Sequence, residues 1–444
     1  MTWRTRASLP YSLAIVGICA CAPAVGGSPA GMGTGAGGGG NGPGGAMGGR
    51  GGAIGTAGTG GAPGNGGTSG STGNGTGMGG AASGGAFGGD DAAASDGGAT
   101  FGLIHPGGFL TQSEMNHIRT NVAAGQDPWA SAWTALKNSD AGPTYQPTVT
   151  ATVTDAYALQ NQGHAAYVLA VKWVASGDVA YATASKRILD AWINTVTSLM
   201  GTTLRTGVGA SQFANAAEIM AYGFNGTAGW PPAQITKAKS WFGNVVWPGI
   251  GQADAQRSSN WGTSAMAGCM ATAIFTDDRA RFDYTVDAYK NGFTDAPDGC
   301  SGVTQYIGEA SGQPAEAGRD QGHAQGGVGH LVEVALMAWN QGMNLVTFTD
   351  NRLVEGMEYL AKYNLGGDVP YDPNFPDPCN VYLNWATISA TGRGSFSPIY
   401  EMANKLFDVA AIPHPFTTQV VNSPGYQPEP TNSDHPGSGT LIER

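Results

Sequence analysis

The chain has 444 residues, of which 73 are glycine, and it carries a net charge of −11 at neutral pH. All of the excess acid lies after residue 100, where 18 basic residues face 29 acidic ones. This balance excludes nucleic acid as a general partner, because phosphate binding needs a basic surface. If the ligand is an anion, a local site must attract it.

The first 25 residues are typical of a secretory signal peptide. Arg4 and Arg6 precede an apolar run, and small residues follow it. The "ICAC" run that ends at Cys21 also resembles the lipobox of bacterial lipoproteins, in which that cysteine is lipidated. Plain secretion and lipid anchoring both remain open. No second segment is apolar enough to span a bilayer. We therefore expect a secreted, outer-surface or periplasmic protein, for which an N-terminal lipid anchor would be the one membrane contact if Cys21 is lipidated.

Residues 26–100 consist almost entirely of small residues, and Arg50 is the single basic residue among them. Such a stretch cannot bury enough apolar surface to offset the chain entropy lost on folding. We therefore expect a flexible tether. Residues 101–444 follow as one domain, which is long enough for a large core or for a repeat architecture.

The domain shows helical periodicity and little strand-like alternation. Its first helix is expected after Thr111, which forms a capping-box signature with Glu114. Beyond this helix a loose repeat recurs, in which a helix of small and apolar residues ends at an acidic turn and an amphipathic helix follows. The clear copies cover residues 167–192, 265–289 and 333–363, with turn acids Asp178, Asp278 and Asp350, and a weaker copy covers residues 213–243.

Alternation of apolar and amphipathic helices is expected when the apolar helices form an inner ring and the amphipathic ones an outer ring. Repeats that cannot bury their own faces must stack on one another. The sequence therefore predicts an all-α fold, an α/α toroid that forms an incomplete barrel of about six or seven helical hairpins. Active sites in such rings gather where the inner helices begin, so the polar residues at those points are the candidates.

Three cysteines lie in the domain. Cys269 is part of the apolar run "SAMAGCMATAIF", which predicts a buried free thiol. Cys300 and Cys379 lie in loop-like surroundings rich in Pro and Asp. In an exported protein these two are the expected disulfide pair.

The segment "EAGRDQGH", residues 316–323, brings Glu316, Arg319, Asp320 and His323 together at spacings of three and four. If the segment is helical, an acid, a guanidinium and an imidazole project from one face. Other polar and aromatic candidates lie near the expected starts of inner helices or late in the chain. They are His164, Asn215, Asn260, Trp261, Gln325, Arg393 and Tyr400.

This mixture of amides, imidazoles, guanidiniums and phenols suits β-elimination from a uronic acid polymer. The reaction removes a weakly acidic proton beside the sugar carboxylate, so the enzyme must stabilise the charge that builds up on that carboxylate. Asn with Arg or His can supply this stabilisation, and Tyr or His can move the proton. Neither a metal nor an organic cofactor is required, and the expected partner is an anionic polysaccharide.

Several separated motifs carry a resemblance to a known family. The runs "FANAAEI", "SSNWGTSAMAGCMATAIFTDDRARFD", "GQPAEAGRDQGHAQGGVGHLVEVALMAWNQG" and "DNRLVEGMEYLAKYNLG" occur in the expected order within residues 104–410. Together they resemble the alginate lyase superfamily of helical-toroid polysaccharide lyases, and most closely polysaccharide lyase family thirty-eight. The resemblance implies cleavage of alginate or glucuronan.

The same resemblance implies roles for individual residues. Asn260 falls where related lyases place the asparagine that neutralises the uronate carboxylate, but Trp261 stands where they have a catalytic His. Their catalytic Tyr lies in a helix comparable to the "RDxxH" segment, which contains no Tyr here. Arg319 and His323 of this segment are therefore assigned to the catalytic set. Tyr306 is the first candidate for the missing phenol, and Tyr400 is the second.

The remaining candidates are assigned to substrate binding, and each also has a structural interpretation. His164 suits a core histidine, Arg393 a loop brace, and both Asn260 and Asn215 a helix cap. Trp261 suits a core aromatic or a sugar-stacking platform. Gln325 and Tyr400 complete the substrate-binding set.

Two other functions remain open. A glycoside hydrolase on the same toroid needs two carboxyl groups beside the scissile bond, and Glu218, Glu316 and Asp320 are available. A tethered protein that binds polysaccharide without cutting it is the other. A metal hydrolase that uses His323 with Asp320 and Glu316 is weaker, since no HExxH motif or Cys pair supports it.

Overall fold

The structure is a computed structural model that describes residues 102–139, 141–201, 203–251, 259–293, 301–375, 385–423 and 434–444. The expected signal peptide, the tether, Cys21 and the Cys300–Cys379 pair lie outside these residues. Within them, no helix combines the length and apolarity needed to cross a membrane.

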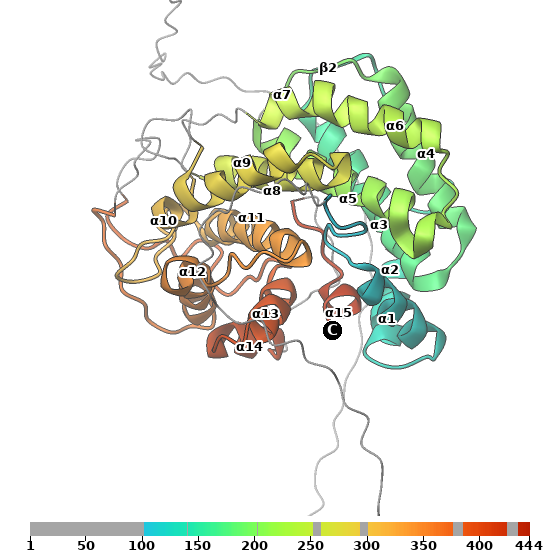
Figure 1. The fold of residues 1–444 in the computed structure, drawn as a ribbon. Helices are drawn as coiled ribbons and strands as arrows, with labels where there is room; N and C mark the ends of the chain where they lie inside the picture. The colour runs from blue at the N-terminus through green and yellow to red at the C-terminus, as the bar shows by residue number, and fades with distance from the viewer. Residues whose placement is uncertain are drawn as a thin grey trace, which may run out of the picture. The chain divides into compact units, whose positions relative to one another are not determined.

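Four helices form the inner wall of the domain, and nearly all of their residues are buried. They pack side by side in chain order (Figure 1). A helix that is apolar on every side must be buried on every side, which explains this position. The inner helices are α3 (Ala156–Ser176), α5 (Thr203–Gly226), α8 (Asn260–Thr276) and α11 (Gln321–Asn340).

An outer helix follows each inner one and covers it from the solvent side (Figure 1). Helices α4, α6 and α9 keep exposed residues on their solvent side, whereas α12 is buried over most of its surface and exposes only Asp350 and Glu355. The outer helices are α4 (Val179–Thr195), α6 (Pro232–Trp241), α9 (Arg279–Asn291) and α12 (Phe348–Asn364). This arrangement is an α/α toroid, and the predicted fold class is confirmed.

Shorter elements complete the described part of the domain. Two helical pairs stand at the ends of the ring, α1 (Gln112–Ala123) with α2 (Trp129–Lys137), and α13 (Tyr400–Val409) with α14 (Pro415–Val421). The rest are η1 (Phe242–Val246), α7 (Trp247–Ile250), α10 (Val303–Tyr306), α15 (Gly439–Ile442), β1 (Thr152–Val153) and β2 (Ser198–Leu199). The two strands pair in parallel, with Thr152 opposite Ser198.

Local sequence signals set the ends of these helices. Thr111 and Glu114 form the predicted capping box of α1. Asp178 and Asp278 are the N-caps of α4 and α9, and each accepts a hydrogen bond from a backbone N–H of the first turn. The third turn acid differs, because Asp350 has a left-handed backbone with φ of 55° near the start of α12. The acidic turns therefore mark all three hairpins, but only two of the acids are N-caps.

The predicted free thiol is also confirmed, since Cys269 is fully buried in the core. Burial in apolar surroundings raises the pKa of this thiol far above its usual range. Cys269 is therefore a packing residue of α8.

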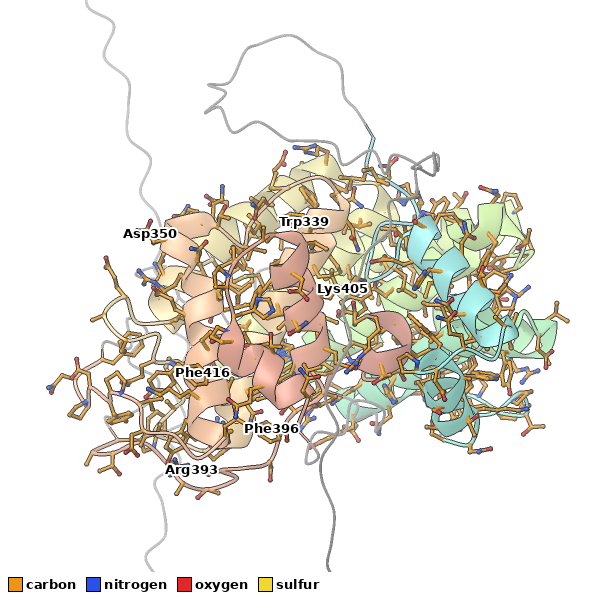
Figure 2. All side chains as sticks on the ribbon, turned by 90° about the horizontal axis from the view of Figure 1, so that it is seen from below. Trp339, Asp350, Arg393, Phe396, Lys405 and Phe416 are labelled. Atoms are coloured by element: carbon orange, nitrogen blue, oxygen red, sulfur yellow. The ribbon has the colours of Figure 1, made fainter. Side chains whose placement is uncertain are left out.

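The hairpin geometry sends all inner-helix N-termini to one end of the ring. Figure 2 shows this for the last complete hairpin, where Trp339 and Asp350 lie at the turn between α11 and α12 and Arg393 lies at the opposite end. Residues 385–399 pass the N-terminus of α11 at that end, where the Gln321 N–H donates to the Thr391 carbonyl over 2.9 Å. The polar residues before α8 and α11 are thereby brought together.

Candidate active site

A cleft of about 310 Å³ opens at the N-terminal ends of α5, α8 and α11. Its size lies at the lower end of the range for small-molecule pockets, roughly 300–1,000 Å³. The side chains that line it are mostly polar and include Arg205, Asn260, His323, Ser397, Asp434 and His435. The position agrees with the expectation that inner-helix entrances carry the site.

Glu316 is the residue on which this end of the site is assembled. Its carboxylate is fully buried and accepts three hydrogen bonds. The Asn260 backbone N–H donates to Oε2 over 2.7 Å, and the Tyr306 hydroxyl donates to the same oxygen over 2.9 Å. The Arg319 guanidinium donates to Oε1 over 2.9 Å. One buried acid thus fixes the start of α8 relative to the segment before α11.

Burial raises the pKa of Glu316, and its hydrogen bonds from Asn260 and Tyr306 and the charge of Arg319 oppose that rise. The Arg319 side chain is 30% exposed, so one part of it contacts Glu316 while the rest remains accessible. Arg319 is therefore held in place by an acid that substrate cannot reach. This geometry suits a guanidinium that binds a carboxylate.

The Asn260 side chain has an unusual environment for a buried amide. Its Oδ1 is buried and has no hydrogen-bond partner among the residues that the structure describes. Asn260 also lines the cleft. Ser259 is the N-cap of α8, so the predicted capping role of Asn260 is not what holds it here. Buried amide groups are normally hydrogen-bonded, so an unsatisfied one at a cleft wall points to a ligand.

His323 and Asp320 form a pair at the start of α11. The Asp320 carboxylate caps the helix by accepting from the His323 backbone N–H over 2.8 Å, and its other oxygen lies 2.6 Å from His323 Nδ1. A carboxylate can only accept, so Nδ1 carries a proton, and in the neutral imidazole Nε2 keeps its lone pair. The ring is 37% exposed and lines the cleft. His323 can therefore act as a base there.

The structure corrects one geometric expectation about this motif. Helix α11 begins at Gln321, and residues 315–319 form turns before it. Glu316, Arg319 and His323 therefore do not project from one helix face. They meet because the turn folds Glu316 beneath Arg319 while Asp320 caps the helix.

Arg205 is a cleft residue that the sequence analysis missed. One of its terminal nitrogens donates to Gln160 over 2.7 Å and lies 3.2 Å from Asp434, and the other donates to the Tyr157 hydroxyl over 2.8 Å. The guanidinium also lies over the Tyr157 ring, 4.0 Å from its centroid. Arg205 could have been found from the sequence because it lies in the first turn of the inner helix α5, where site residues are expected. Arg205 is therefore a second guanidinium in the candidate site, besides Arg319.

His330 and His435 were also missed as cleft residues. His330 is buried, and it lines the cleft together with His435. Burial and the neighbouring His435 hold the pKa of His330 well below its usual range. No local pattern could bring residue 435 to α11, because the two lie about a hundred positions apart in the chain.

The two tyrosines expected to move protons are both buried away from the cleft. Tyr306 is fully buried and donates to Glu316, and Tyr400 is fully buried and donates to the Gln325 side chain over 3.1 Å. Burial raises the pKa of the Tyr400 hydroxyl well above its usual range. In this structure both phenols serve as supports rather than as cleft residues.

Four residues assigned to substrate binding make intramolecular contacts instead. Gln325 donates to the Ser395 carbonyl over 2.9 Å, and Arg393 donates to the carbonyls of Tyr363 and Gly367 over 2.9 Å each. Asn215 accepts from the Phe109 N–H over 2.6 Å. His164 is buried, with Nδ1 2.8 Å from the Gln212 side chain. The brace and core interpretations fit Arg393 and His164 better than substrate contact does.

Trp261 is half-buried in the first turn of α8, next to Asn260, and its backbone N–H donates to the hydroxyl of the cap residue Ser259 over 3.2 Å.

The acids proposed for a hydrolase are not paired at the cleft. Glu218 lies 2.7 Å from His105, and Glu316 is fully buried, so Asp320 is the one of these three acids that lines the cleft, which Asp434 also lines.

A family model described as "Alginate lyase" matches residues 117–369 of the chain. A search of curated proteins gives no match.

Solved structures of alginate lyases share the fold. Alginate lyase A1-III in complex with a tetrasaccharide superposes with a TM-score of 0.55 at 15% identity, covering 77% of this chain and 96% of that one. The A1-III enzyme from Sphingomonas species A1 gives 0.53 at 14% identity, covering 78% and 99%. An alginate lyase from Bacteroides ovatus gives 0.51 at 14% identity, covering 77% and 100%. At these identities the likeness shows the α/α toroid alone.

Proposed function

The chain belongs to the alginate lyase family and is a polysaccharide lyase, and we propose that it cleaves alginate or glucuronan by β-elimination in the cleft at the start of α5, α8 and α11. Two observations carry this proposal: Asn260 and His323 line the same cleft, and the buried Glu316 ties Arg319 to the start of α8. An amide, a guanidinium and a free imidazole nitrogen are the groups that this reaction needs.

Asn260 and Arg319 are proposed to hold the uronate carboxylate. The guanidinium supplies a fixed positive charge, and the Asn260 side-chain amide at the cleft wall supplies N–H donors. As the proton beside the carboxylate leaves, negative charge moves onto the carboxylate oxygens. Donors already in place stabilise that charge without reorganisation, which lowers the barrier.

His323 is proposed to be the base. Its Nε2 takes the proton from C5 of the uronate, the C5–H electron pair forms the C4–C5 double bond, and the C4–O bond breaks. The leaving oxygen receives a proton, which the protonated His323 can return. Asp320 holds the ring in the right tautomer and stabilises the imidazolium that forms. Arg205, which lines the cleft, is proposed to bind a neighbouring sugar unit together with Tyr157, whose hydroxyl it contacts.

The test is a substrate panel. The purified protein is incubated separately with polymannuronate, polyguluronate, glucuronan and a neutral glucan, and both the ultraviolet absorbance of unsaturated uronate and new reducing ends are followed. We expect the two signals to rise together on one uronan and neither to rise on the glucan. Reducing ends without the absorbance would identify a hydrolase. The absence of both signals on every uronan would contradict the proposed substrate class.

A further inference from the structure

Three potential metal ligands meet beneath the cleft. His330 and Glu333 lie three residues apart on α11 and so share one helix face. His435 comes from the C-terminal segment and packs against that face. Each is only 2% exposed, and one ligand atom from each lies within 4.8 Å of the other two. They are the one such group found in the described parts of the chain.

His330 supplies an independent sign that a ligand is held here. Both of its ring nitrogens are buried, and neither has a hydrogen-bond partner among the described residues. Buried polar atoms are nearly always hydrogen-bonded, so an imidazole with two unsatisfied nitrogens needs an explanation. A metal ion bound by one of these nitrogens would provide it.

The helix surface is shaped to admit His435. A Cβ at Gly329 would lie 2.8 Å from Cε1 of His435, so a larger residue there would push the ring away. At Gly326 a Cβ would lie 3.8 Å from the same ring. The His330 and His435 rings consequently approach to 4.6 Å between centroids, and His435 Nδ1 lies 2.8 Å from Glu333 Oε1.

We propose that His330, Glu333 and His435 bind a divalent transition-metal ion of the Zn²⁺ class, with the fourth coordination position facing the cleft. Two imidazoles and one carboxylate form a ligand set that suits Zn²⁺ or Co²⁺, and three protein ligands leave one position open. Ligand atoms of a tetrahedral site with bonds of about 2.0–2.1 Å lie roughly 3.3 Å apart, which small side-chain movements reach from this arrangement.

The proposal goes beyond the lyase activity and departs from the expectation that no metal is needed. The ion would tie the C-terminal segment to α11 directly beneath the catalytic groups. His330 and His435 line the same cleft as His323, so the ion would also add positive charge where an anionic sugar binds. Metal binding and elimination are measured separately, so either can fail alone.

The test is a titration of the chelator-treated full chain with Co²⁺, followed by its visible absorption and by calorimetry. We expect one ion per chain and the intense bands of a four-coordinate site. Glu333→Gln, which preserves volume, and His435→Ala should each weaken binding at least about tenfold. His117→Ala is the matched control, because His117 is exposed on α1 and should leave the affinity unchanged. Circular dichroism checks that each variant is folded.

Two results would overturn the proposal. One is the absence of saturable Co²⁺ binding by the wild-type chain. The other is binding that survives both Glu333→Gln and His435→Ala but disappears in Asp320→Asn, which would place the ion at the His323 pair.

Discussion

At the scale of single residues, Glu316 holds the proposed active site together. It is fully buried and contacts three of the four residues proposed as catalytic from sequence, either through backbone or through side chain. The sequence left its role open between a catalytic acid and a structural ion pair. Its burial favours a positioning role, because a carboxylate that substrate cannot reach can act only through the residues that it holds.

Glu316→Gln tests this role. The amide keeps the volume but loses the charge that holds Arg319, so we expect kcat to fall by about 10- to 100-fold while the pH profile set by His323 stays unchanged. The measurement is the pH dependence of uronate elimination for both proteins. Glu355→Gln is the control, since that acid lies on α12 away from the cleft. A purely structural role would instead lower the thermal midpoint and leave kcat of the folded protein intact.

Much of the residue-level site could be predicted because helix starts demand polar groups. Asn260, Arg319 and His323 lie just at or before such starts, and the structure brings all three to one end. The fate of Tyr306 could not be predicted, because its burial depends on Glu316 and on Gly327 of another helix. His435 carries no local pattern at all.

At the scale of elements, α11 packs against the buried Tyr306 and also lines the cleft. Adjacent glycines of this helix face different surroundings. A Cβ at Gly327 would overlap the hydroxyl of the buried Tyr306, whereas the nearest atom to a Cβ at Gly326 is 3.8 Å away. Substitution by Ala adds the same methyl group at both positions, so Gly326 serves as the control for Gly327.

We expect Gly327→Ala to lower the free energy of unfolding by about 1–3 kcal/mol, because the added methyl group overpacks the site of Tyr306. Gly326→Ala should leave it unchanged or raise it by up to about 1 kcal/mol, because Ala favours the helix. Denaturant unfolding of both variants beside the wild type measures this. Equal stabilities would show that Tyr306 does not pack on α11 as described.

The N-terminal segment that docks beside α5 offers a pH-dependent test. Burial lowers the pKa of His105, but the hydrogen bond and charge of Glu218 outweigh it, so the net shift is upward. A raised histidine pKa stabilises the fold fully below about 6.5 and loses that effect as pH rises through the folded value. Hence His105→Gln should cost more stability at pH 5.5 than at pH 9. A constant difference between the two proteins across this range would rule out the ion pair.

The paired helices could be predicted from the alternation of apolar and amphipathic segments around acidic turns. The turn acids Asp178 and Asp278 lie between the paired helices as expected, and both are N-caps. The left-handed stretch at Asp350 was not foreseen, and neither was the short β1–β2 pair, whose strands are far apart in the sequence.

At the scale of the whole domain, buried charge joins the two ends of the ring. Lys405 of α13 forms ion pairs with Glu114 of α1 and, over 2.9 Å, with Glu443 beside α15. The Glu443 side chain is 1% exposed. Despite burial, the two carboxylates raise the pKa of Lys405 above its usual range. This cluster links the first and last helices of the toroid.

We expect Lys405→Met to lower the free energy of unfolding by about 3–5 kcal/mol, because it leaves the buried Glu443 and the half-buried Glu114 without their shared partner. Lys237→Met is the control, since Lys237 makes only an exposed contact with Asn194 and should change stability by less than about 0.5 kcal/mol. Thermal and denaturant unfolding compare the two. A similar small effect at both positions would mean that the ring is closed by apolar packing alone.

The toroid itself could be predicted because the alternation of apolar and amphipathic helices admits few other arrangements. The closure of the ring could not, since Glu114, Lys405 and Glu443 are far apart in sequence and no periodicity relates them. The same holds for the placement of the C-terminal segment in the cleft.

The most direct test of the central claim is the rate of unsaturated-uronate formation by the wild type and by His323→Gln on the preferred uronan, with His117→Ala as the control. We predict that the absorbance rises for the wild type and the control, and that His323→Gln is slower by about 10²- to 10⁴-fold while remaining folded. A His323→Gln protein that eliminates at the wild-type rate would contradict the assignment of the reaction to this cleft.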